Sequence, residues 1–396
     1  MKKTICVLLM AMLLSGSVNA FAKDAITEAM DKGVIYSDKG KDDEAIVEFN
    51  KAIAINPNLA KAYGERGSAY KHKGDFDKAI ADETKAIKID PKSDTAYYNR
   101  GNAYTKKGNL DQAISDYTKS IAINPKDFKV YLNRGNRYFE KGRFDQAISD
   151  YNKVIEINSG YAGAYRNRGG AYENQGNFIQ AISDFTKVIK INPKDAAAYS
   201  NRGFIYFAKK EYDKAILDFT KVIELNPNDF KAYCGRASAY CQKKNYNQVI
   251  LDCNKAIKLN PKDAIAYGVK GFTYLYEGNF DKAISEYTKA IEINPTLPLI
   301  NSQLGVAYNN KAYELYQKGE NLDKGLESID KAISMYPNNG IYLSTKAELL
   351  YKLGRYNEAY EHIKKGIKLE PNLAEIKNDV KMIEKALNEL KKKPLK

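Results

Sequence analysis

Apolar positions recur along most of the chain with the spacing of two short helices. Tyr97, Gly101 and Tyr104 stand at i, i+4 and i+7, so they share one face of a helix. Gly108 then interrupts this helix, because glycine readily adopts the left-handed conformation of a helix C-cap. A second apolar face follows at i, i+1, i+4 and i+8, carried by Ala113, Ile114, Tyr117 and Ile121. An Asn-Pro pair at residues 124–125 ends it, so the stretch predicts two helices joined by a turn.

This two-helix pattern repeats along the chain with a period of 34 residues. The first tyrosine of the pattern returns at Tyr63, Tyr97, Tyr131, Tyr165, Tyr199, Tyr233 and Tyr267. The terminal proline keeps the same phase at Pro57, Pro91, Pro125, Pro193, Pro227, Pro261 and Pro295, with Ser159 in the one vacant slot. Pro337 and Pro371 are again 34 residues apart. A fixed period of this length predicts an array of units that bury their flanks against one another.

The best-kept unit, residues 96–125, closely resembles the tetratricopeptide repeat. Period, glycine, alanine, tyrosine and proline all agree with the pattern of that family over residues 26–373. About ten units begin near residues 26, 60, 94, 128, 162, 196, 230, 264, 298 and 340. The resemblance implies an all-α fold, a right-handed superhelical solenoid of helix-turn-helix units with a concave groove lined by the first helices.

One unit departs from the regular length. Pro295 and Pro337 are 42 residues apart, so the unit that begins near residue 298 carries eight extra residues. An apolar stripe continues across this region through Leu304, Tyr308, Ala312, Leu315 and Tyr316. We therefore expect a first helix that is longer by about two turns and protrudes beyond its neighbours.

A further helix is predicted behind the last unit, over residues 374–392. Its apolar face is carried by Ile376, Val380, Ile383, Leu387 and Leu390. Such a helix would cap the last open repeat, because the end of a repeat array otherwise exposes an apolar flank. A partner-binding amphipathic helix is the alternative interpretation. Residues 393–396 are expected to form a tail.

The N-terminal residues 1–22 have the organisation of a secretory signal peptide. Lys2 and Lys3 precede an apolar run from Ile5 to Leu14, and Ala20-Phe21-Ala22 offers small residues before a cleavage point. The run is too short for a membrane-spanning helix, which needs about 20 residues. We therefore expect an exported protein, periplasmic or secreted, with no transmembrane span in the mature chain. An N-terminal core helix is the alternative.

The net charge of +14 raises the question of a nucleic-acid or anionic-membrane partner. One lysine per unit stands on the second helix, away from its apolar face: Lys51, Lys85, Lys119, Lys153, Lys187, Lys221, Lys255 and Lys289. This placement predicts a solvated surface with the charge diluted along the array. Together with export, it argues against nucleic acid as a partner.

A second charge pattern links the two helices of each unit. Six arginines are each followed 16 residues later by an aspartate: Arg66 and Asp82, Arg100 and Asp116, Arg134 and Asp150, Arg168 and Asp184, Arg202 and Asp218, Arg236 and Asp252. In two other units the pair becomes Lys32 with Glu48 and Lys270 with Glu286. Because both members change together, we predict a structural ion pair within each unit. Inheritance of both residues by duplication is the alternative.

Four asparagines fall at one groove-side phase of the first helix: Asn99, Asn133, Asn167 and Asn201. An amide offers a donor and an acceptor together, which matches a peptide backbone without reading its side chains. The row is similar to the asparagine ladder in the repeats of O-linked N-acetylglucosamine transferase, which holds extended polypeptide; the transferase activity is not implied here. The alternative is that these residues only satisfy the helix surface.

Further groove residues are predicted at neighbouring phases: Asn102, Asn136, Phe204, Phe207, Phe272 and Leu275. The apolar members would add the affinity that amides alone do not supply, since hydrogen bonds contribute only about 1 kcal/mol each. For these four residues, extra core between adjacent units is the alternative interpretation.

Signals for catalysis are weak, and we predict no catalytic residues, no metal and no cofactor. His72 and His362 lie in different units. Cys234 and Cys241 are about 10.5 Å apart along one predicted helix, beyond the roughly 7 Å that a disulfide allows between Cα atoms. Cys253 takes a position held by aromatic residues elsewhere, which predicts core. A thiol-dependent enzyme is a remote alternative.

The sequence therefore predicts a protein–protein interaction scaffold that binds extended polypeptide in a concave groove. Export would place it in a cell-envelope or secreted assembly. The alternative is a scaffold of a polysaccharide export or biosynthesis complex, which similar repeat proteins also serve. The oligomeric state stays open.

Overall fold

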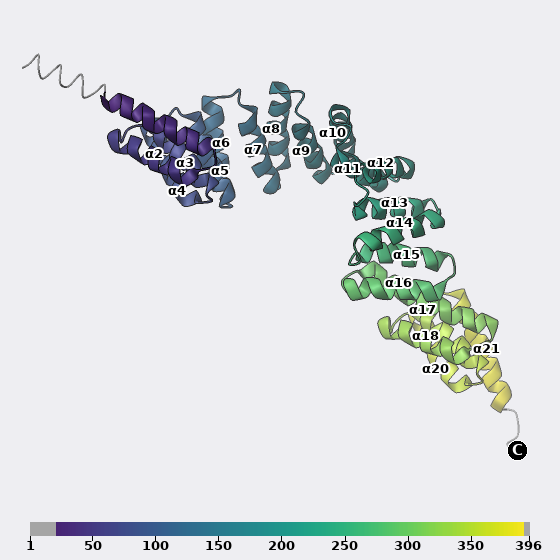
Figure 1. Cartoon of the computed structure of the whole chain (residues 1–396). Helices are drawn as coiled ribbons and strands as arrows, with labels where there is room; N and C mark the ends of the chain where they lie inside the picture. The colour runs from purple at the N-terminus through teal and green to yellow at the C-terminus, as the bar shows by residue number, and fades with distance from the viewer. Residues whose placement is uncertain (1–20, 392–396) are drawn as a thin grey trace, which may run out of the picture. The chain divides into compact units, whose positions relative to one another are not determined.

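The computed structural model describes residues 21–391, which form helices and short turns with no β-strand in that range. A helix over residues 21–38 precedes the others (Figure 1). The rest are α2 (Asp42–Ile55), α3 (Ala60–His72), α4 (Phe76–Ile89), α5 (Asp94–Lys106), α6 (Leu110–Ile123), α7 (Phe128–Glu140), α8 (Phe144–Ile157), α9 (Ala162–Asn174), α10 (Phe178–Ile191), α11 (Ala196–Ala208), α12 (Tyr212–Leu225), α13 (Phe230–Gln242), α14 (Tyr246–Leu259), α15 (Ala264–Tyr276), α16 (Phe280–Ile293), α17 (Pro298–Lys318), α18 (Leu322–Met335), α19 (Gly340–Lys352), α20 (Tyr356–Leu369) and α21 (Ala374–Lys391). The predicted all-α fold is confirmed.

Two sequence predictions fall largely outside the described residues. Of the predicted signal segment 1–22, only residues 21 and 22 are described, and they are helical. The predicted tail, residues 393–396, lies wholly outside. Within residues 21–391, no helix is both long enough and apolar enough to cross a bilayer.

The chain divides into two compact units, Met1–Ala198 and Tyr199–Lys396. In each unit, consecutive helices pack as antiparallel pairs, such as α3 with α4 and α15 with α16. Neighbouring first helices also touch, as α3 does with α5 and α13 with α15, which brings the first helices of successive pairs together on one side of the stack. This side is the place to look for a binding surface.

The turn within each pair requires a left-handed residue. Gly108 has φ +77°, and glycine holds the equivalent position in most other pairs. Lys210 and Lys244 take it in two pairs, with φ of 62° and 58°. The two-helix pattern therefore tolerates a side chain there, at the strain that left-handed backbone imposes on a lysine.

The small residue at Gly101 is explained by the ring of Tyr117. A Cβ atom on Gly101 would lie 2.8 Å from Tyr117 Cε1, and one on Gly135 would lie 2.9 Å from Tyr151 Cε1. Both tyrosines are 1% exposed. Because real Cβ contacts are not this short, any larger residue at Gly101 would displace the ring that fills the space between the paired helices.

Helix α17 carries the eight extra residues. It has 21 residues, whereas α15 has 13. Its added turns do not stand free, because Ala312 is fully buried and Tyr316 packs against the core formed by α18 to α21. The Lys352 ammonium of α19 lies 4.4 Å from the centre of the Tyr316 ring. The lengthened helix thus packs against its neighbours along its added turns. The prediction that it protrudes beyond them is wrong.

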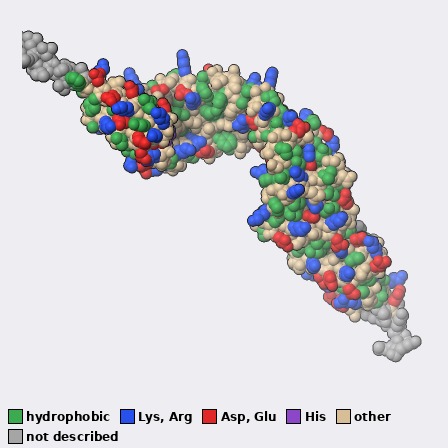
Figure 2. All heavy atoms as spheres, in the orientation of Figure 1, with side chains coloured by type: hydrophobic (Ala, Val, Ile, Leu, Met, Phe, Trp, Pro, Cys, Tyr) green, Lys and Arg blue, Asp and Glu red, His purple; other side chains and the backbone are tan. Residues whose placement is uncertain are grey.

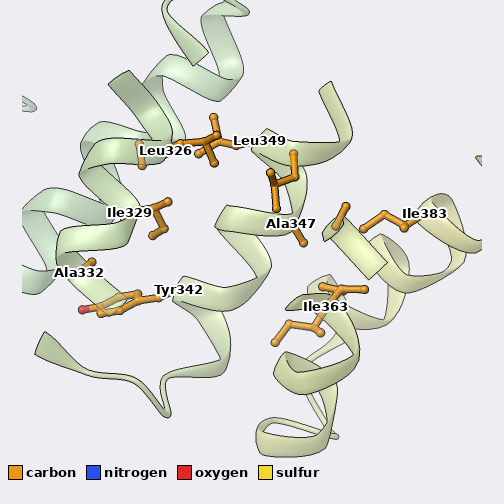
Figure 3. Close-up of a cluster of buried hydrophobic side chains, with 12 residues drawn as sticks. Leu326, Ile329, Ala332, Tyr342, Ala347, Leu349, Ile363 and Ile383 are labelled. Atoms are coloured by element: carbon orange, nitrogen blue, oxygen red, sulfur yellow. The ribbon is translucent and has the colours of Figure 1, made fainter. Parts of the chain in front are cut away.

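Helix α21 closes the C-terminal end of the array. Its residues Ile376 and Ile383 are 1% and 0% exposed and join a cluster that includes Ile329, Leu349 and Ile363 (Figure 3). Ser344 Oγ on α19 donates to Asp379 Oδ2 at 2.7 Å. A helix buried in this way covers the apolar flank of the last pair, which is the role of a cap.

Candidate functional site

Arginine–aspartate pairs run through the paired helices. In each of the six pairs, arginine Nη2 lies 2.6 to 2.8 Å from one carboxylate oxygen and Nε donates to the other. The aspartates are only 3% to 6% exposed. These are bidentate and largely desolvated ion pairs, so they differ from the exposed pairs that contribute little to stability.

Arginines of these pairs also reach the preceding pair of helices. Arg100 Nη1 donates to Thr84 Oγ1 at 3.0 Å, and Arg134 Nη1 donates to Thr118 Oγ1 at 3.0 Å. The same kind of contact joins Arg66 to Asn50, Arg168 to Asn152 and Arg236 to Thr220. The sequence pattern predicts contact only within a unit, whereas these guanidinium groups also link one unit to the next.

The two lysine–glutamate pairs behave differently from each other. Lys270 Nζ lies 3.0 Å from Glu286 Oε1, as the co-change of residues indicates. Lys32 instead pairs with Glu28 at 2.6 Å, and Glu48 pairs with Lys51 at 2.7 Å. The prediction of a Lys32–Glu48 pair is therefore wrong, because a carboxylate one turn away on the same helix competes for a flexible lysine.

The predicted asparagine row is bonded within the protein. Asn133 Nδ2 donates to Asn102 Oδ1 at 3.2 Å, and Asn167 Nδ2 donates to Asn136 Oδ1 at 2.9 Å. Asn133 Nδ2 also lies 3.1 Å from the Tyr98 hydroxyl. The amide donors of Asn133 and Asn167 therefore connect adjacent first helices.

Asn102 and Asn136 act mainly as acceptors for buried tyrosines. The Tyr117 hydroxyl donates to Asn102 Oδ1 at 2.8 Å, and the Tyr151 hydroxyl donates to Asn136 Oδ1 at 2.9 Å. Their assignment as free groove amides is corrected, because these oxygens already accept two hydrogen bonds each. The signal was present in the sequence: where the ring is phenylalanine, as at Phe185, the residue fifteen positions earlier is Gly170 and not asparagine.

The other two asparagines have different surroundings. Asn99 on α5 lines a cavity of about 410 Å³ together with Ser68 and Glu83. Asn201 is half-buried on α11. The four asparagines therefore do not form one uniform row of amides.

An apolar groove lies in the C-terminal unit, on α11, α13, α15 and the start of α17. It consists of two adjoining hollows of about 690 and 370 Å³, which share Phe207, Ser238, Ile265 and Leu297. Phe204 and Phe230 line the first hollow, and Phe272 and Leu299 line the second. Three of the predicted residues, Phe204, Phe207 and Phe272, thus face this groove.

Leu275 does not belong to the groove. It is 8% exposed and packs with Tyr287 and Leu304 in the core between α15, α16 and α17. Its assignment as a binding residue is wrong, because Tyr287 of α16 and Leu304 of α17 pack against its side chain.

The hydroxyl of Tyr287 is a feature that the sequence analysis missed. Tyr287 lines the second hollow, is 1% exposed, and its hydroxyl has no hydrogen-bond partner among the described residues. Phe272 stands fifteen residues earlier, where Asn102 stands relative to Tyr117, so the usual acceptor is missing. A buried hydroxyl left in this state favours a ligand group that can bond to it.

Family models of the tetratricopeptide repeat match residues 95–127, 162–195, 196–229, 230–263, 253–285 and 340–373. A model described as TPR repeat matches residues 33–74, 67–108, 135–176 and 271–312. Together the matches span well over half of the chain. The chain belongs to the tetratricopeptide repeat family.

Solved structures with similarity to this tetratricopeptide array include a MamA protein, at 31% identity, covering 44% of this chain and 96% of that chain with a TM-score of 0.41. YrrB, titled a TPR protein with an unusual peptide-binding site, is 25% identical over 50% of this chain and 97% of its own, with a TM-score of 0.43. A tetratricopeptide repeat protein from Parabacteroides merdae is 24% identical over 63% of this chain and 99% of its own, with a TM-score of 0.47. None of the curated proteins matches the sequence.

The cysteines of the tetratricopeptide array are free and buried. Cys253 is fully buried, as predicted, and Cys234 and Cys241 are each 8% exposed. Burial raises the pKa of the Cys234 thiol, and the nearby Asp263 carboxylate raises it further. Because the thiolate is the nucleophile, this environment works against thiol catalysis. No group of three or more potential metal ligands occurs among residues 21–391.

Charges on the tetratricopeptide array are balanced locally. Figure 2 shows Lys and Arg side chains interspersed with Asp and Glu on the visible face. Lysines in the turns reach aspartates of the preceding unit, as Lys141 does with Asp111 at 2.6 Å and as Lys107 does with Asp77. Such pairing brings opposite charges together between units, and the visible face carries no single-sign patch.

Proposed function

We propose that the apolar groove binds an extended polypeptide and that the protein acts as an interaction scaffold. The observation that supports this most directly is the exposure of large apolar side chains where the groove is hollowed. Phe204, Ile265 and Leu299 are 42%, 58% and 72% exposed, and all three line the hollows. Contiguous exposed apolar surface of this kind marks binding sites, because water contact with it is unfavourable.

The chemistry of the lining favours a polypeptide over a glycan. The second hollow is mainly apolar and has one buried hydroxyl, that of Tyr287, without a partner. Apolar side chains of a peptide would fill the two hollows, and a peptide carbonyl would accept from Tyr287. A polysaccharide, the alternative ligand class, requires many hydrogen-bonding groups, and the second hollow supplies few.

The binding proposal is tested by selecting peptides from a phage-displayed library of 12-residue sequences against the mature protein. Selected peptides are expected to carry apolar residues at alternating positions. Phe272→Ala should weaken their binding by roughly 10- to 100-fold, because burial of a phenylalanine side chain contributes about 1.5–3 kcal/mol. Affinities are measured by isothermal titration calorimetry.

Leu217→Ala is the matched control, since Leu217 is an apolar residue that is 70% exposed and does not line the groove. It should leave the affinity unchanged. Peptides that bind wild type and Phe272→Ala equally well would place the binding surface elsewhere, and the absence of any selected peptide would argue against polypeptide binding.

We further propose that the scaffold works in the cell envelope or as a secreted protein. The basic start, apolar run and small residues of residues 1–22 support this. The expected mature protein begins at Lys23, and its intact mass after cell fractionation checks both the cleavage and the compartment. A cytoplasmic protein with Met1 retained would contradict export.

A further inference from the structure

A buried carboxyl group without a partner lies in the N-terminal unit. Glu83 on α4 is 1% exposed, and neither of its carboxyl oxygens has a hydrogen-bond partner among the described residues. It stands where Tyr117 and Tyr151 stand in the next two units, and there the tyrosine hydroxyls bond to asparagines. Glutamate is shorter than tyrosine, so it leaves space that the ring would fill.

The space beside Glu83 is the cavity of about 410 Å³ between α3, α4 and α5. The carboxyl lies against the α3 backbone, because a Cβ on Gly64 would be 3.8 Å from Oε2 and one on Gly67 would be 3.2 Å from Oε1. Ser68 takes the position that Asn102 holds in the next unit. Its side chain is too short to reach the Glu83 carboxyl in the way that the Asn102 amide reaches the Tyr117 hydroxyl. The buried carboxyl therefore lies at the wall of a cavity that is large enough for a small ligand.

Charged groups around the cavity are mainly acidic. Helix α3 contributes Glu65 and Lys61, and the end of α4 contributes Asp90. Helix α5 lines the cavity with uncharged residues only, namely Thr95, Ala96 and Asn99. Two further charged groups act on Glu83 from nearby: Asp82, which is paired with Arg66, and Lys71.

The protonation state of Glu83 follows from its burial. Burial raises the pKa of Glu83 to about 8, and Asp82 and Glu65 add to the increase, while the Asn99 amide and the Lys71 ammonium oppose it. At neutral pH the group is therefore mostly protonated in the free protein. A buried carboxyl without hydrogen bonds is unfavourable in either state, and a cation that donates to it would relieve this.

We propose that this cavity binds an organic cation, a primary ammonium or guanidinium group on an alkyl stem, with its N–H groups donating to the Glu83 carboxylate. The polar Ser68 and Asn99 side chains line the remaining space for further hydrogen bonds. The inference is independent of the polypeptide groove, because this cavity lies in the N-terminal unit and the groove lies in the C-terminal unit. A negative result for the cation cavity therefore does not contradict the polypeptide groove, and the reverse also holds.

The probes are capped tripeptides, acetyl-Gly-X-Gly-amide, with X as lysine, arginine, norleucine or citrulline, together with free butylamine. Binding to the full mature protein is followed by NMR, through the backbone amides of Gly64 and Gly67 and the carboxyl carbon of Glu83. We expect lysine and arginine peptides to shift these signals and the neutral peptides not to. Equal binding of butylamine would identify a free amine as a sufficient ligand, whereas tighter binding of the peptides would identify a polypeptide side chain.

Proton release provides a second readout. At pH 7 the cation must displace a proton from Glu83, so the calorimetric binding enthalpy should vary with the ionisation enthalpy of the buffer, and affinity should rise about tenfold for each pH unit between pH 6 and 7. Glu83→Gln keeps the shape and removes the charge, and Glu83→Tyr restores the residue of the next unit.

Both Glu83 variants should abolish cation binding and the buffer dependence, while Glu156→Gln, a change at an exposed glutamate of α8, should preserve them. Far-UV circular dichroism confirms that each variant is folded. The proposal is overturned if cationic and neutral probes bind alike, or if Glu83→Gln binds the cations as wild type does.

Discussion

Arg134→Ala is expected to lower the free energy of unfolding by about 3–5 kcal/mol, which is a large share of the stability of a typical domain. Arg134 donates two hydrogen bonds to Asp150, at 2.8 and 2.7 Å, and Asp150 is only 3% exposed. The alanine variant would leave this carboxylate buried without a counter-charge. It would also remove the link from Arg134 Nη1 to Thr118 in the preceding unit.

The measurement is urea denaturation followed by circular dichroism, with hydrogen exchange of α7 and α8 to locate the loss. Lys153→Ala is the control, because Lys153 pairs with Glu156 on the surface and both side chains are more than half exposed. That change should cost less than about 1 kcal/mol. The double variant Arg134→Met with Asp150→Leu should recover most of the stability, since it removes both buried charges together. Similar losses for Arg134→Ala and Lys153→Ala would contradict the buried character of the pair.

The pair of helices that holds Glu83 is expected to lose stability as the pH rises. Burial raises the pKa of Glu83 to about 8, well above the value of 4.5 for an unperturbed glutamate. Between these two pH values the folded state holds a proton that the unfolded state releases, so the free energy of unfolding falls as the pH rises from about 4.5 to about 8. The difference is on the order of 5 kcal/mol, and stability changes little with this group outside that window.

Denaturation of wild type and Glu83→Gln at several pH values between 4.5 and 8.5 checks this prediction. The difference between the two proteins isolates Glu83, because the other titrating groups are shared. Wild type should lose stability relative to Glu83→Gln across the window, and Glu156→Gln should follow wild type. Glu83→Tyr should remove the pH dependence as well. Parallel curves for wild type and Glu83→Gln would show that Glu83 titrates at its ordinary pKa when folded.

The helix pairs could be predicted because their determinants are local. The spacing of Tyr97, Gly101 and Tyr104 defines a helical face, and Gly108 and Pro125 mark the helix ends within a few residues of where they occur. Because the units repeat, comparing them within one sequence can also predict contacts. Arginine and aspartate change together to Lys270 and Glu286, which predicts a direct ion pair, and these two side chains do form one.

The candidate site was less predictable, because it depends on how neighbouring units pack. Helical phase correctly predicts that Phe204, Phe207 and Phe272 lie on the groove side. The same phase predicts Leu275 there, but the lengthened α17 covers this residue. Helical phase also predicts Asn102 and Asn136 as groove amides, although tyrosine hydroxyls of the paired helix donate to their side-chain oxygens. The position of a residue on a helix face does not determine which neighbouring side chain contacts it.

The sequence by itself determined the helix pairs, their period, the family and the arginine–aspartate contacts, because each arises from spacing within or between copies of one short unit. Only the tertiary structure decided which polar groups are left without a partner. Glu83 and Tyr287 differ from their counterparts by substitutions that are plain in the sequence, at position 83 itself and at Phe272. Both side chains are buried and lack hydrogen-bond partners because several helices pack around each of them. A local sequence pattern does not specify this packing.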